Sequence, residues 1–488
     1  FHTVVLGPLI ASVKDSVPRV AAHALAALTN FLEGAPKAAV AGKIAEILEL
    51  CLQFLHNGIS LIKENAMSTI SALAEASHRD FTQYWQSTAE TVFNILKTAT
   101  QKEYKQLRGQ AIECLTLIGA AVGKEEFKKA AHEIIQCMLE IQQGNVEESD
   151  PQKSYLLSGW QRVCIILKED FIPYLDAILP SLFDMVEEII KNDEKRRFGN
   201  EEDQDFVKVQ SAFTGKPQPR LNVNTSETED LKIALNMINN FVVELRKGYL
   251  NYVERTSSII EPLMDYSSNE EIRITAAKCF PGLIRVVKES GHVNAPQIVK
   301  NMVVKYLNIL WETISSEAEP RVMAMLTYSM REIIHIAGRC LNEGEVRELS
   351  ERIYKALKSS DERIQTKEQW ANEDDIDQDE IEELEDDAEM EEELQVALAG
   401  LIGALFATHK ELNLPFVQTI FKEILPKALD PSMSPRMHKF GLFLIDDMIE
   451  HLGVELIPNE WPHLSEALMK FATSKYCEVR QAAVYGIG

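Results

Sequence analysis

The sequence predicts an all-α fold in which pairs of antiparallel helices stack into a superhelical solenoid, and three observations support this prediction. First, apolar residues recur at helical spacing along almost the whole chain, without the long alternating stretches that are typical of strands. Second, the predicted helices come in pairs of similar length, and the second helices repeat after about 42 to 45 residues. Third, a short phrase recurs where the second helix begins.

The first four helix pairs follow one another without interruption. Their period lies in the range of about 40–47 residues that is typical of HEAT repeats. A single pair cannot bury its apolar face by itself, so stacked pairs would share one continuous core. The prediction is therefore a HEAT-repeat α-solenoid, and the alternative is a large irregular helical bundle. We expect the pairs at 1–15 with 18–34, 38–56 with 59–77, 81–98 with 103–122, and 125–142 with 152–168.

The recurring phrase has a physical reason at each of its positions. Proline suits the first turn of a helix, where no backbone N–H is needed, and it occupies positions 18, 320 and 435. We expect the arginine of the phrase to tie neighbouring turns together, and the small alanines to let the paired helix approach closely. The five copies are DSVPRVAAHAL (15–25), NEEIRITAAKC (269–279), EAEPRVMAML (317–326), SMSPRMHKFG (432–441) and CEVRQAAVYGIG (477–488), with arginines at 19, 273, 321, 436 and 480.

Two stretches break the period. Residues 192–230 are rich in Gly, Pro, Asn and charge, which predicts a long excursion between helices at 171–191 and 229–247. The distance from Arg321 to Arg436 exceeds two repeats by roughly 25 to 30 residues, so a second insertion lies within a repeat. The predicted organisation is HEAT repeats over 1–191, an insertion loop over 192–230, HEAT repeats over 231–364, an acidic insertion over 365–390 and HEAT repeats over 391–488.

The acidic insertion contains most of an unusual run of charge. Residues 373 to 393 include fifteen Asp or Glu and no Lys, Arg or His. So many like charges repel one another and bury little, so we expect a solvated loop through about Asp387 and a helix that begins near Glu391. The run either tunes charge and shields a groove or contacts a partner directly. Its candidate contact residues are Glu373, Asp374, Asp375, Asp377, Asp379, Glu380, Glu382 and Glu383.

Charge and composition limit the possible functions. The formal net charge of −25 argues against a phosphate-binding surface and favours basic partners. The seven scattered cysteines, with no C-x-x-C motif, indicate reduced core thiols in a cytosolic or nuclear setting. No apolar run approaches the roughly 18 residues of a membrane span. The chain opens on Phe1 rather than Met and stops inside a predicted helix at Gly488, so we expect a piece of a longer protein.

The sequence offers little for catalysis. It has no glycine-rich phosphate loop, no H-E-x-x-H motif and no nucleophile elbow. Its eleven histidines include no pair at i, i+4, and the acidic EEDQD at 201–205 lacks the glycine and terminal Glu of a calcium loop. We therefore expect neither an enzyme nor a cofactor or metal site.

The most informative surface is one stripe along the second helices. On helix 18–34 the stripe is formed by His23, Ala26, Asn30 and Glu33, which face away from Val20, Ala24, Leu28 and Phe31. The next two repeats place Asn65, Ser68, Ala72 and Glu75, then Gln110, Glu113, Leu117 and Ala120, in the same frame. Small residues would leave room for an extended peptide, and carboxylates would hold its Lys or Arg. An ordinary solvated helix face is the alternative.

The candidate binding residues follow from this stripe. Trp160 joins them because its ring could stack on the aliphatic stem of a lysine, although a core position is the commoner one for tryptophan. The full set is His23, Asn30, Glu33, Asn65, Ser68, Glu75, Glu113 and Trp160.

Several long phrases resemble a known family in order and spacing. They are RVAAHALAALTNFLEGA (19–35), IECLTLIGAAVGKEEF (112–127), GWQRVCIILKEDFIPYL (159–175), FLIDDMIEHLG (443–453) and CEVRQAAVYGIG (477–488). They resemble the karyopherin-β nuclear import receptors, in particular the importin-five or importin-beta-three subfamily. The resemblance runs in one register from about residue 5 to the end, and both insertions fall where that subfamily has them.

The resemblance implies a function as well as a fold. In the family, second helices bind cargo with basic nuclear localisation segments, first helices contact phenylalanine–glycine (FG) repeats of nucleoporins, and Ran carrying GTP releases cargo. The family's cargo stripe maps onto the second helices that hold Glu33 and Glu75. The main grip on Ran lies in repeats that this chain lacks, and the receptor would shuttle between cytoplasm and nucleus through the pore. Direct nucleic-acid binding and membrane insertion are not expected.

The leading hypothesis is therefore a nuclear transport receptor that carries Lys-rich cargo on a concave surface. The alternative comes from another class, a static HEAT scaffold that assembles other protein subunits. A scaffold tends to have regular, uninterrupted repeats, whereas this chain has two long insertions.

Overall fold

The computed structural model describes residues 2–144, 150–198, 207–210, 217–220, 225–266, 269–370 and 378–488. The predicted all-α fold is confirmed, since the described residues form helices and their connections apart from two strands of four residues each. The chain divides into two compact units. Unit 1 comprises Phe1–Asp205 with Asn222–Tyr249, and unit 2 comprises Phe206–Leu221 with Leu250–Gly488.

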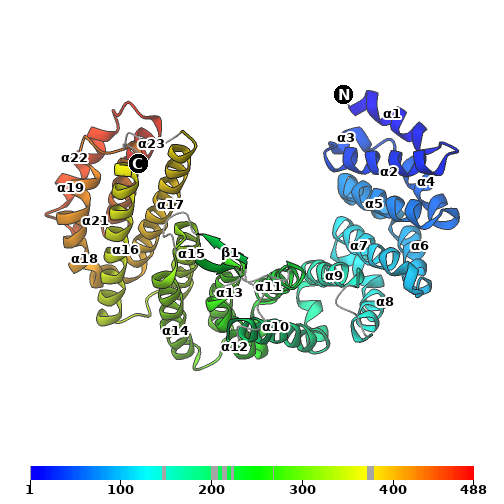
Figure 1. The fold of residues 1–488 in the computed structure, drawn as a ribbon, viewed down its shortest axis with the longest axis horizontal. Coiled ribbons are helices and arrows are strands. Elements are labelled where there is room, and N and C mark those ends of the chain that lie inside the picture. The colour runs from blue at the N-terminus through cyan, green and yellow to red at the C-terminus, as the bar shows by residue number, and fades with distance from the viewer. Residues whose placement is uncertain are drawn as a thin grey trace. The chain divides into compact units, whose positions relative to one another are not determined.

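Unit 1 is a stack of helix pairs (Figure 1). The observed helices agree closely with the predicted ones, although short helices and 3-10 turns precede several of them. In order they are α1 (His2–Val13) and α2 (Pro18–Glu33); α3 (Lys37–Val40), α4 (Ile44–Asn57) and α5 (Ser60–Ser77); η1 (His78–Tyr84), α6 (Trp85–Thr98), η2 (Lys102–Tyr104) and α7 (Lys105–Val122); α8 (Lys124–Gln143) and α9 (Gln152–Leu167); η3 (Lys168–Tyr174), α10 (Leu175–Phe198) and α11 (Thr225–Leu245).

Unit 2 continues the same pattern, after η5 (Arg246–Tyr252) at the boundary between the units. The predicted excursion over 192–230 is shorter than expected, because α10 extends to Phe198 and α11 begins at Thr225. Within it β1 (Val207–Gln210) pairs antiparallel with β2 (Pro217–Arg220), with Val207 opposite Arg220. The helices are α12 (Val253–Ile260), η6 (Glu261–Asp265) and α13 (Glu270–Glu289); α14 (Ala295–Ser316) and α15 (Pro320–Ala337); α16 (Glu343–Trp370) and α17 (Gln378–His409); η7 (Lys410–Asn413), α18 (Leu414–Thr419), the π-helical turn η8 (Ile420–Ile424), α19 (Leu425–Ala428) and α20 (Pro435–His451); α21 (Gly453–Leu456), α22 (Trp461–Phe471) and α23 (Cys477–Ile487).

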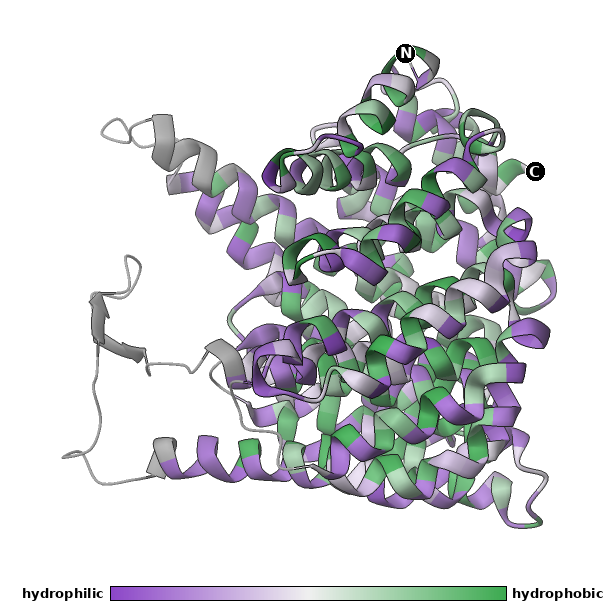
Figure 2. Ribbon diagram, turned by 90° about the vertical axis from the view of Figure 1, so that its right-hand side faces the viewer, coloured by the Kyte–Doolittle hydropathy of each residue, from purple (hydrophilic) through white to green (hydrophobic). Residues whose placement is uncertain are grey.

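The second helices form the central row of each unit. In unit 1, α2, α5, α7, α9 and α11 each pack against the next, and in unit 2 α13, α15, α17, α20 and α23 do the same. Hydrophobic residues gather where helices meet and hydrophilic residues face outward (Figure 2). Leu25, Ile70 and Leu115 on successive second helices are fully buried. Each pair thus shares its core with its neighbours, as a solenoid requires.

The starts of the second helices confirm the proline prediction. Pro18, Pro320 and Pro435 occupy the first turns of α2, α15 and α20. Where proline is absent a side chain can cap the helix instead. The Asn269 side chain accepts a hydrogen bond from the Glu271 backbone N–H at 2.8 Å at the start of α13.

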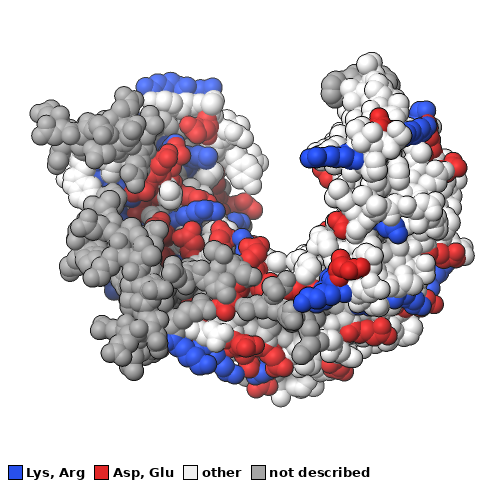
Figure 3. Space-filling view, turned by 45° about the vertical axis from the view of Figure 1, so that its right-hand side comes forward, with Lys and Arg blue, Asp and Glu red and all other residues white. Residues whose placement is uncertain are grey.

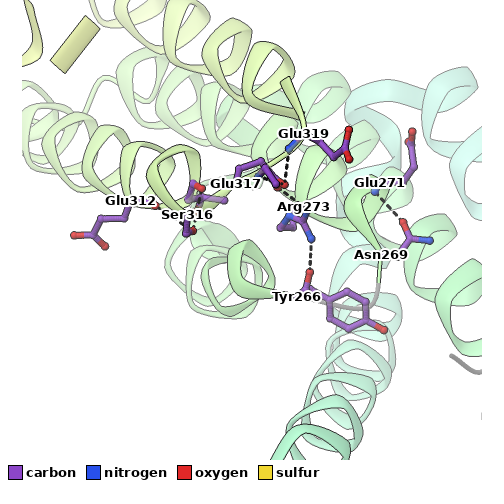
Figure 4. Close-up of polar contacts among 10 residues, drawn as sticks. Tyr266, Asn269, Glu271, Arg273, Glu312, Ser316, Glu317 and Glu319 are labelled. Atoms are coloured by element: carbon purple, nitrogen blue, oxygen red, sulfur yellow. Dashed lines mark hydrogen bonds and ion pairs between the residues drawn. The ribbon is translucent and has the colours of Figure 1, made fainter. Parts of the chain in front are cut away.

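Three arginines of the recurring phrase link neighbouring repeats in unit 2, and Figure 4 shows one of them, Arg273. Arg273 on α13 donates to the Tyr266 carbonyl at 2.8 Å and to Glu317 Oε2, beyond α14, at 2.6 Å. Arg321 lies 3.7 Å from Glu271. Arg436 pairs with Glu392 at 2.8 Å. Arg480 instead donates to carbonyls of its own preceding loop, and Arg19 is exposed.

A second recurring feature joins one repeat to the next. A basic residue ends a second helix with positive φ at His78, Lys168, Arg246 and Lys410, where φ is 50°, 51°, 45° and 25°. Such a conformation is uncommon for a residue with a Cβ and marks a tight turn. Three of these turns are anchored by a fully buried aromatic residue three positions on: Phe81, Phe171 and Tyr249.

The structure tests two expectations from the sequence, that the cysteines are reduced core thiols and that no helix spans a membrane. All seven thiols are free. Five are buried, but Cys340 is half-buried and Cys477 is exposed, so the core prediction is wrong for Cys477. Burial raises the pKa of the Cys114 thiol to about 12. Across the described ranges, no helix is long and apolar enough to cross a membrane.

Candidate functional site

The predicted binding stripe lies on neighbouring second helices of unit 1. His23, Asn30 and Glu33 are exposed on α2, and Glu75 is exposed on α5. Asn65 and Ser68 on α5 are half-buried. The stripe therefore has side chains that solvent reaches on both helices, which a binding surface requires.

Hydrogen bonds between threonines fix how α2 lies against α5. The Thr29 and Thr69 hydroxyl oxygens are 3.0 Å apart. Thr69 also lies within hydrogen-bond distance of the Leu25 carbonyl, at 3.3 Å. Since Thr29 adjoins Asn30 and Thr69 adjoins Ser68 in sequence, this contact brings the two segments of the stripe side by side. The contacts of Thr29 and Thr69 thus fix the backbone of the stripe on α2 and α5.

The buried face of α2 differs from the predicted one. Ala24 and Leu28 are buried as expected, but Val20 is 42% exposed and Phe31 is half-buried. The buried arc instead passes through Ala21, Leu25, Leu28 and Leu32. Val20 and Phe31 were wrongly predicted as core because the true buried arc is centred further round the helix, on the side of Ala21, Leu25 and Leu32.

Glu113 on α7 is engaged by an arginine that the sequence reasoning missed. Its carboxylate lies 3.9 Å from Arg162 Nη2, and Arg162 Nε donates to the Thr116 hydroxyl at 2.9 Å. Burial lowers the pKa of the Arg162 guanidinium, and the Glu113 charge opposes that shift. Arg162 thus partly neutralises Glu113. The signal was present in GWQRV, where Arg162 stands two positions after Trp160.

Trp160 is a core residue, so its assignment as a contact with a partner is wrong. It is 1% exposed, and its indole N–H donates to Gln142 Oε1 on α8 at 2.8 Å. Its ring lies 6.3 Å from the Phe171 ring. A buried indole needs a partner for its N–H, and Gln142 supplies one.

The candidate residues of the acidic run lie largely beyond what the structure describes. Glu373, Asp374, Asp375 and Asp377 fall outside the described residues. Asp379, Glu380, Glu382 and Glu383 lie on α17, but their side chains are not among those described. The helix itself begins at Gln378 and not near Glu391, so the predicted extent of the loop is wrong.

The later part of the acidic run is paired with basic residues of the repeats around it. Asp387 lies 3.1 Å from Lys367, and Glu392 lies 2.8 Å from Arg436. Glu391 is fully buried and accepts from Arg363 Nη2 at 2.9 Å and from Ser360 at 2.8 Å. These pairings compensate the repulsion that led us to expect a loop.

Charge is mixed on the surface as a whole. Among the residues coloured in Figure 3, Asp and Glu side chains lie among Lys and Arg side chains, not in one acidic block. Within the described ranges, no group of three or more His, Cys, Asp or Glu is placed to hold a metal ion. A basic partner would therefore be recognised by particular carboxylates and not by a uniform field.

Comparison with known protein families gives two matches. The model described as "Importin subunit beta-1-like, TPR repeats" matches residues 16–198, and the model described as "Importin repeat 6" matches residues 322–426. Both matched segments lie in the helical repeats.

Curated relatives agree with these matches. Importin subunit beta-3 of Saccharomyces cerevisiae is 28% identical, over 100% of this chain and 44% of its own length. A probable importin-5 homolog of Dictyostelium discoideum is 25% identical, over 89% of this chain and 39% of its own length. The chain thus spans less than half the length of these relatives.

Solved structures of Kap121p have the same fold. Kap121p alone is 26% identical, with a TM-score of 0.81 over 100% of this chain and 44% of the Kap121p chain. Kap121p bound to Pho4p is 26% identical with a TM-score of 0.78, over 100% and 44% of the two chains. Kap121p bound to Nup53p is 25% identical with a TM-score of 0.78, over 99% and 44%. With its HEAT-repeat solenoid and its importin-type repeats, the chain is similar to the importins, among them importin subunit beta-3 and a probable importin-5 homolog.

Proposed function

We propose that the chain is the part of a nuclear transport receptor that binds Lys-rich nuclear localisation segments of cargo. The observation that carries this proposal is the exposed stripe with Asn30, Glu33 and Glu75 on the adjacent helices α2 and α5. Kap121p, solved bound to Pho4p and to the SUMO protease Ulp1p, supports it by similarity. The protein would act as a carrier and not as an enzyme, and it would move between cytoplasm and nucleus.

The stripe would recognise cargo by complementary charge. Glu33 and Glu75 would accept hydrogen bonds from Lys or Arg side chains, and Asn30 and Asn65 would bind the peptide backbone of an extended segment. His23 and Ser68 would border this peptide, and Glu113 would contribute less because Arg162 engages it. Exposed ion pairs are screened over about 8 Å at physiological ionic strength, so binding should weaken as salt is added.

Reversing two charges of the stripe tests the proposal. We expect Glu33→Lys with Glu75→Lys to weaken binding of a fluorescent Lys-rich peptide at least about tenfold, or about 1.4 kcal/mol, because like charges then face each other. Fluorescence anisotropy with this chain measures the affinity. Both side chains are exposed, so circular dichroism should show an unchanged fold.

A matched control separates local contacts from net charge. Glu49→Lys with Glu140→Lys changes the charge by the same amount on the first helices α4 and α8, where both side chains are exposed. This control should bind the peptide like the parent chain. Equal losses in the two double variants would show that only the overall field matters and would exclude the stripe as the site.

The first helices offer a place for nucleoporin FG repeats. A crevice of about 420 Å³ lies between α6 and α8 and is lined by Trp85, Ala89, Phe93, Ala130 and Ile134. These apolar and aromatic side chains would accept a phenylalanine ring from such a repeat. The rest of the crevice is lined by Leu115 and by the polar or charged residues Gln86, Glu90, Glu126, Lys129 and Glu133. Kap121p solved bound to Nup53p supports this assignment by similarity only.

A single charge in the crevice tests this second contact. We expect Ala130→Glu to weaken binding of a phenylalanine–glycine peptide several-fold, because the new carboxylate would have to lose water where the apolar ring docks beside the apolar part of the lining. Affinity is measured by anisotropy, with Ala45→Glu on the exposed face of α4 as the control. An unchanged affinity for Ala130→Glu would move the FG site elsewhere.

Release would depend on a further partner. We propose that Ran carrying GTP displaces the cargo, mainly through repeats outside this chain, which spans 44% of importin subunit beta-3. The acidic run would then act either as a charged shield of the cargo surface or as a direct contact with cargo or Ran. No direct contact with nucleic acid is proposed, in keeping with the net charge of −25.

A further inference from the structure

Unit 2 contains a pocket that the proposed cargo stripe does not use. It has a volume of about 750 Å³ and lies between the second helices α15, α17, α20 and α23. Its walls include Tyr328 from α15, Gly403 from α17, Phe443 from α20 and Tyr485 from α23. It shares no residue with the stripe on α2 and α5.

The pocket contains a buried carboxylate. Asp446 is 6% exposed, and among the residues that the structure describes neither of its carboxylate oxygens has a hydrogen-bond partner. A buried charge of this kind is costly unless it is paired. Burial, followed by the nearby carboxylates of Asp447 and Glu450, raises the pKa of Asp446 to about 7.

The neighbouring carboxylate has a similar environment. Burial and then Glu450 raise the pKa of Asp447 to about 6, while Arg331 acts in the opposite direction. Asp447 lies 3.9 Å from His451 Nε2. Two adjacent carboxylates are thus held in conditions that favour their neutral forms.

Glycines of two other helices make room for this pair. A Cβ at Gly403 on α17 would lie 2.3 Å from Asp447 Oδ2, and a Cβ at Gly486 on α23 would lie 1.8 Å from Asp446 Oδ1. Both distances are shorter than any van der Waals contact, so no larger residue could stand at either position with the carboxylates where they are. The backbone of three helices is therefore shaped around the two carboxylates.

The remaining walls suit a cation with an apolar stem. Tyr328, Phe443 and Tyr485 supply aromatic rings beside the carboxylates, and cations are attracted to the faces of such rings. Four carboxylates line the pocket, from Asp446, Asp447, Glu450 and Glu478, against the fixed positive charges of Arg331 and Lys439. When these carboxylates are ionised, the balance of charge in the pocket is negative.

We infer that this pocket binds the cationic side chain of a lysine or arginine from an extended segment of a partner protein. An ammonium or guanidinium group would donate to Asp446 and Asp447, and its methylene stem would lie against the aromatic rings. The volume also admits residues next to the bound side chain. This inference is independent of the proposed cargo stripe, since it concerns other helices and other residues.

The ionisation of the pocket carboxylates makes the affinity for the bound cation depend on pH. A bound cation favours the ionised carboxylates, so binding should release protons and tighten as the pH rises from 6 to 8. The groups that face the pair are Arg331, His335 and Tyr328 on α15, Lys439, Glu450 and His451 on α20, and Glu478 and Tyr485 on α23; α17 lines the pocket with apolar residues and glycine only. Burial, followed by the Arg331 charge, lowers the pKa of His335, so this imidazole contributes little positive charge over the same range.

Isosteric removal of the two charges tests the inference. The probe is a peptide with fluorescein on its N-terminus, fluorescein-Gly-Lys-Arg-Gly-amide, titrated onto the chain in a Glu33→Lys, Glu75→Lys background so that the stripe cannot contribute. We expect Asp446→Asn with Asp447→Asn to lower its affinity at least about tenfold and to flatten the rise between pH 6 and 8. The control Glu455→Gln with Glu466→Gln removes the same charge from exposed positions on α21 and α22 and should bind normally.

The variants should fold, which keeps the test decisive. A carboxyl whose pKa is raised on folding opposes folding as the pH rises from about 4 through 7, so the asparagine variant should melt no lower than the parent at pH 8. As a second variant, Gln481→Arg at an exposed position of the pocket wall places a guanidinium there and should compete with the peptide. Affinity within twofold of the parent in both variants, or equal binding of fluorescein-Gly-Gln-Gln-Gly-amide, would overturn the inference.

Discussion

Glu391→Ala is expected to lower the free energy of unfolding by about 3 kcal/mol, which is a large loss for the removal of one buried carboxylate. Glu391 is 0% exposed and binds both Arg363 and Ser360. Its removal leaves the Ser360 hydroxyl, which is fully buried, and the Arg363 guanidinium without their acceptor. Breaking a buried pair costs about 3–5 kcal/mol, and we expect the lower end because the Arg363 side chain is 37% exposed and can be hydrated.

A neighbouring carboxylate supplies the control for this experiment. Glu389→Ala removes a side chain that is 60% exposed and pairs with Arg436. Exposed pairs contribute about 0–1 kcal/mol, so this variant should unfold almost like the parent in guanidinium denaturation followed by circular dichroism. If Glu391→Ala were as stable as Glu389→Ala, the buried pair would not hold α16 and α17 together.

The second large effect is expected at Trp160. Trp160→Ala should lower the free energy of unfolding by about 3–5 kcal/mol, because it removes a buried indole and leaves a cavity next to Phe171. Trp160→Phe should cost less, since it keeps an aromatic ring and loses mainly the hydrogen bond to Gln142. Thermal and denaturant unfolding measure both values.

Binding data then distinguish the two roles of this residue. A core tryptophan predicts that folded Trp160→Phe binds the Lys-rich peptide with the affinity of the parent. Loss of peptide binding with unchanged stability would instead place the indole at the partner, contrary to its 1% exposure.

The helix pairs could be predicted because they depend on a periodic pattern. Predicted helix 59–77 is α5, Ser60–Ser77, and predicted helix 103–122 contains α7, Lys105–Val122. The spacing of apolar residues shows which face of a helix is buried, whatever element covers that face. A helix can therefore be predicted without knowing which element it packs against. The same reasoning located Pro320 and Pro435 at helix starts.

The rotation of a helix is harder to predict than its extent. On α2 the predicted core included Val20 and Phe31, yet Ala21 and Leu32 are the buried residues. A second helix contacts its own partner and two neighbouring repeats, so small alanines are buried where larger side chains would not fit. Hydrophobicity alone then points to the wrong face. Trp160 was misplaced for a different reason, because possible stacking on a lysine was followed in place of the core position that is commoner for tryptophan.

Pairing between residues far apart in sequence explains why the structure around the acidic residues was not predicted. The run over 373–393 contains no basic residue, but Arg363, Lys367 and Arg436 from outside it pair with its later carboxylates. Asp446 and Asp447 stand in an amphipathic helix that looks ordinary in sequence. The three-dimensional packing, with Gly403 and Gly486 close against them, shows that they lie at a pocket.

The links between repeats have a further consequence for how the chain folds. Arg273 reaches Glu317, Lys305 reaches Glu261 and Arg436 reaches Glu392, each across 44 positions of sequence. Contacts of this kind require closure of short loops only, and chains rich in them fold quickly for their size. Each repeat can dock on the one before it as soon as it leaves the ribosome, so a chain of 488 residues can fold without waiting for its distant end.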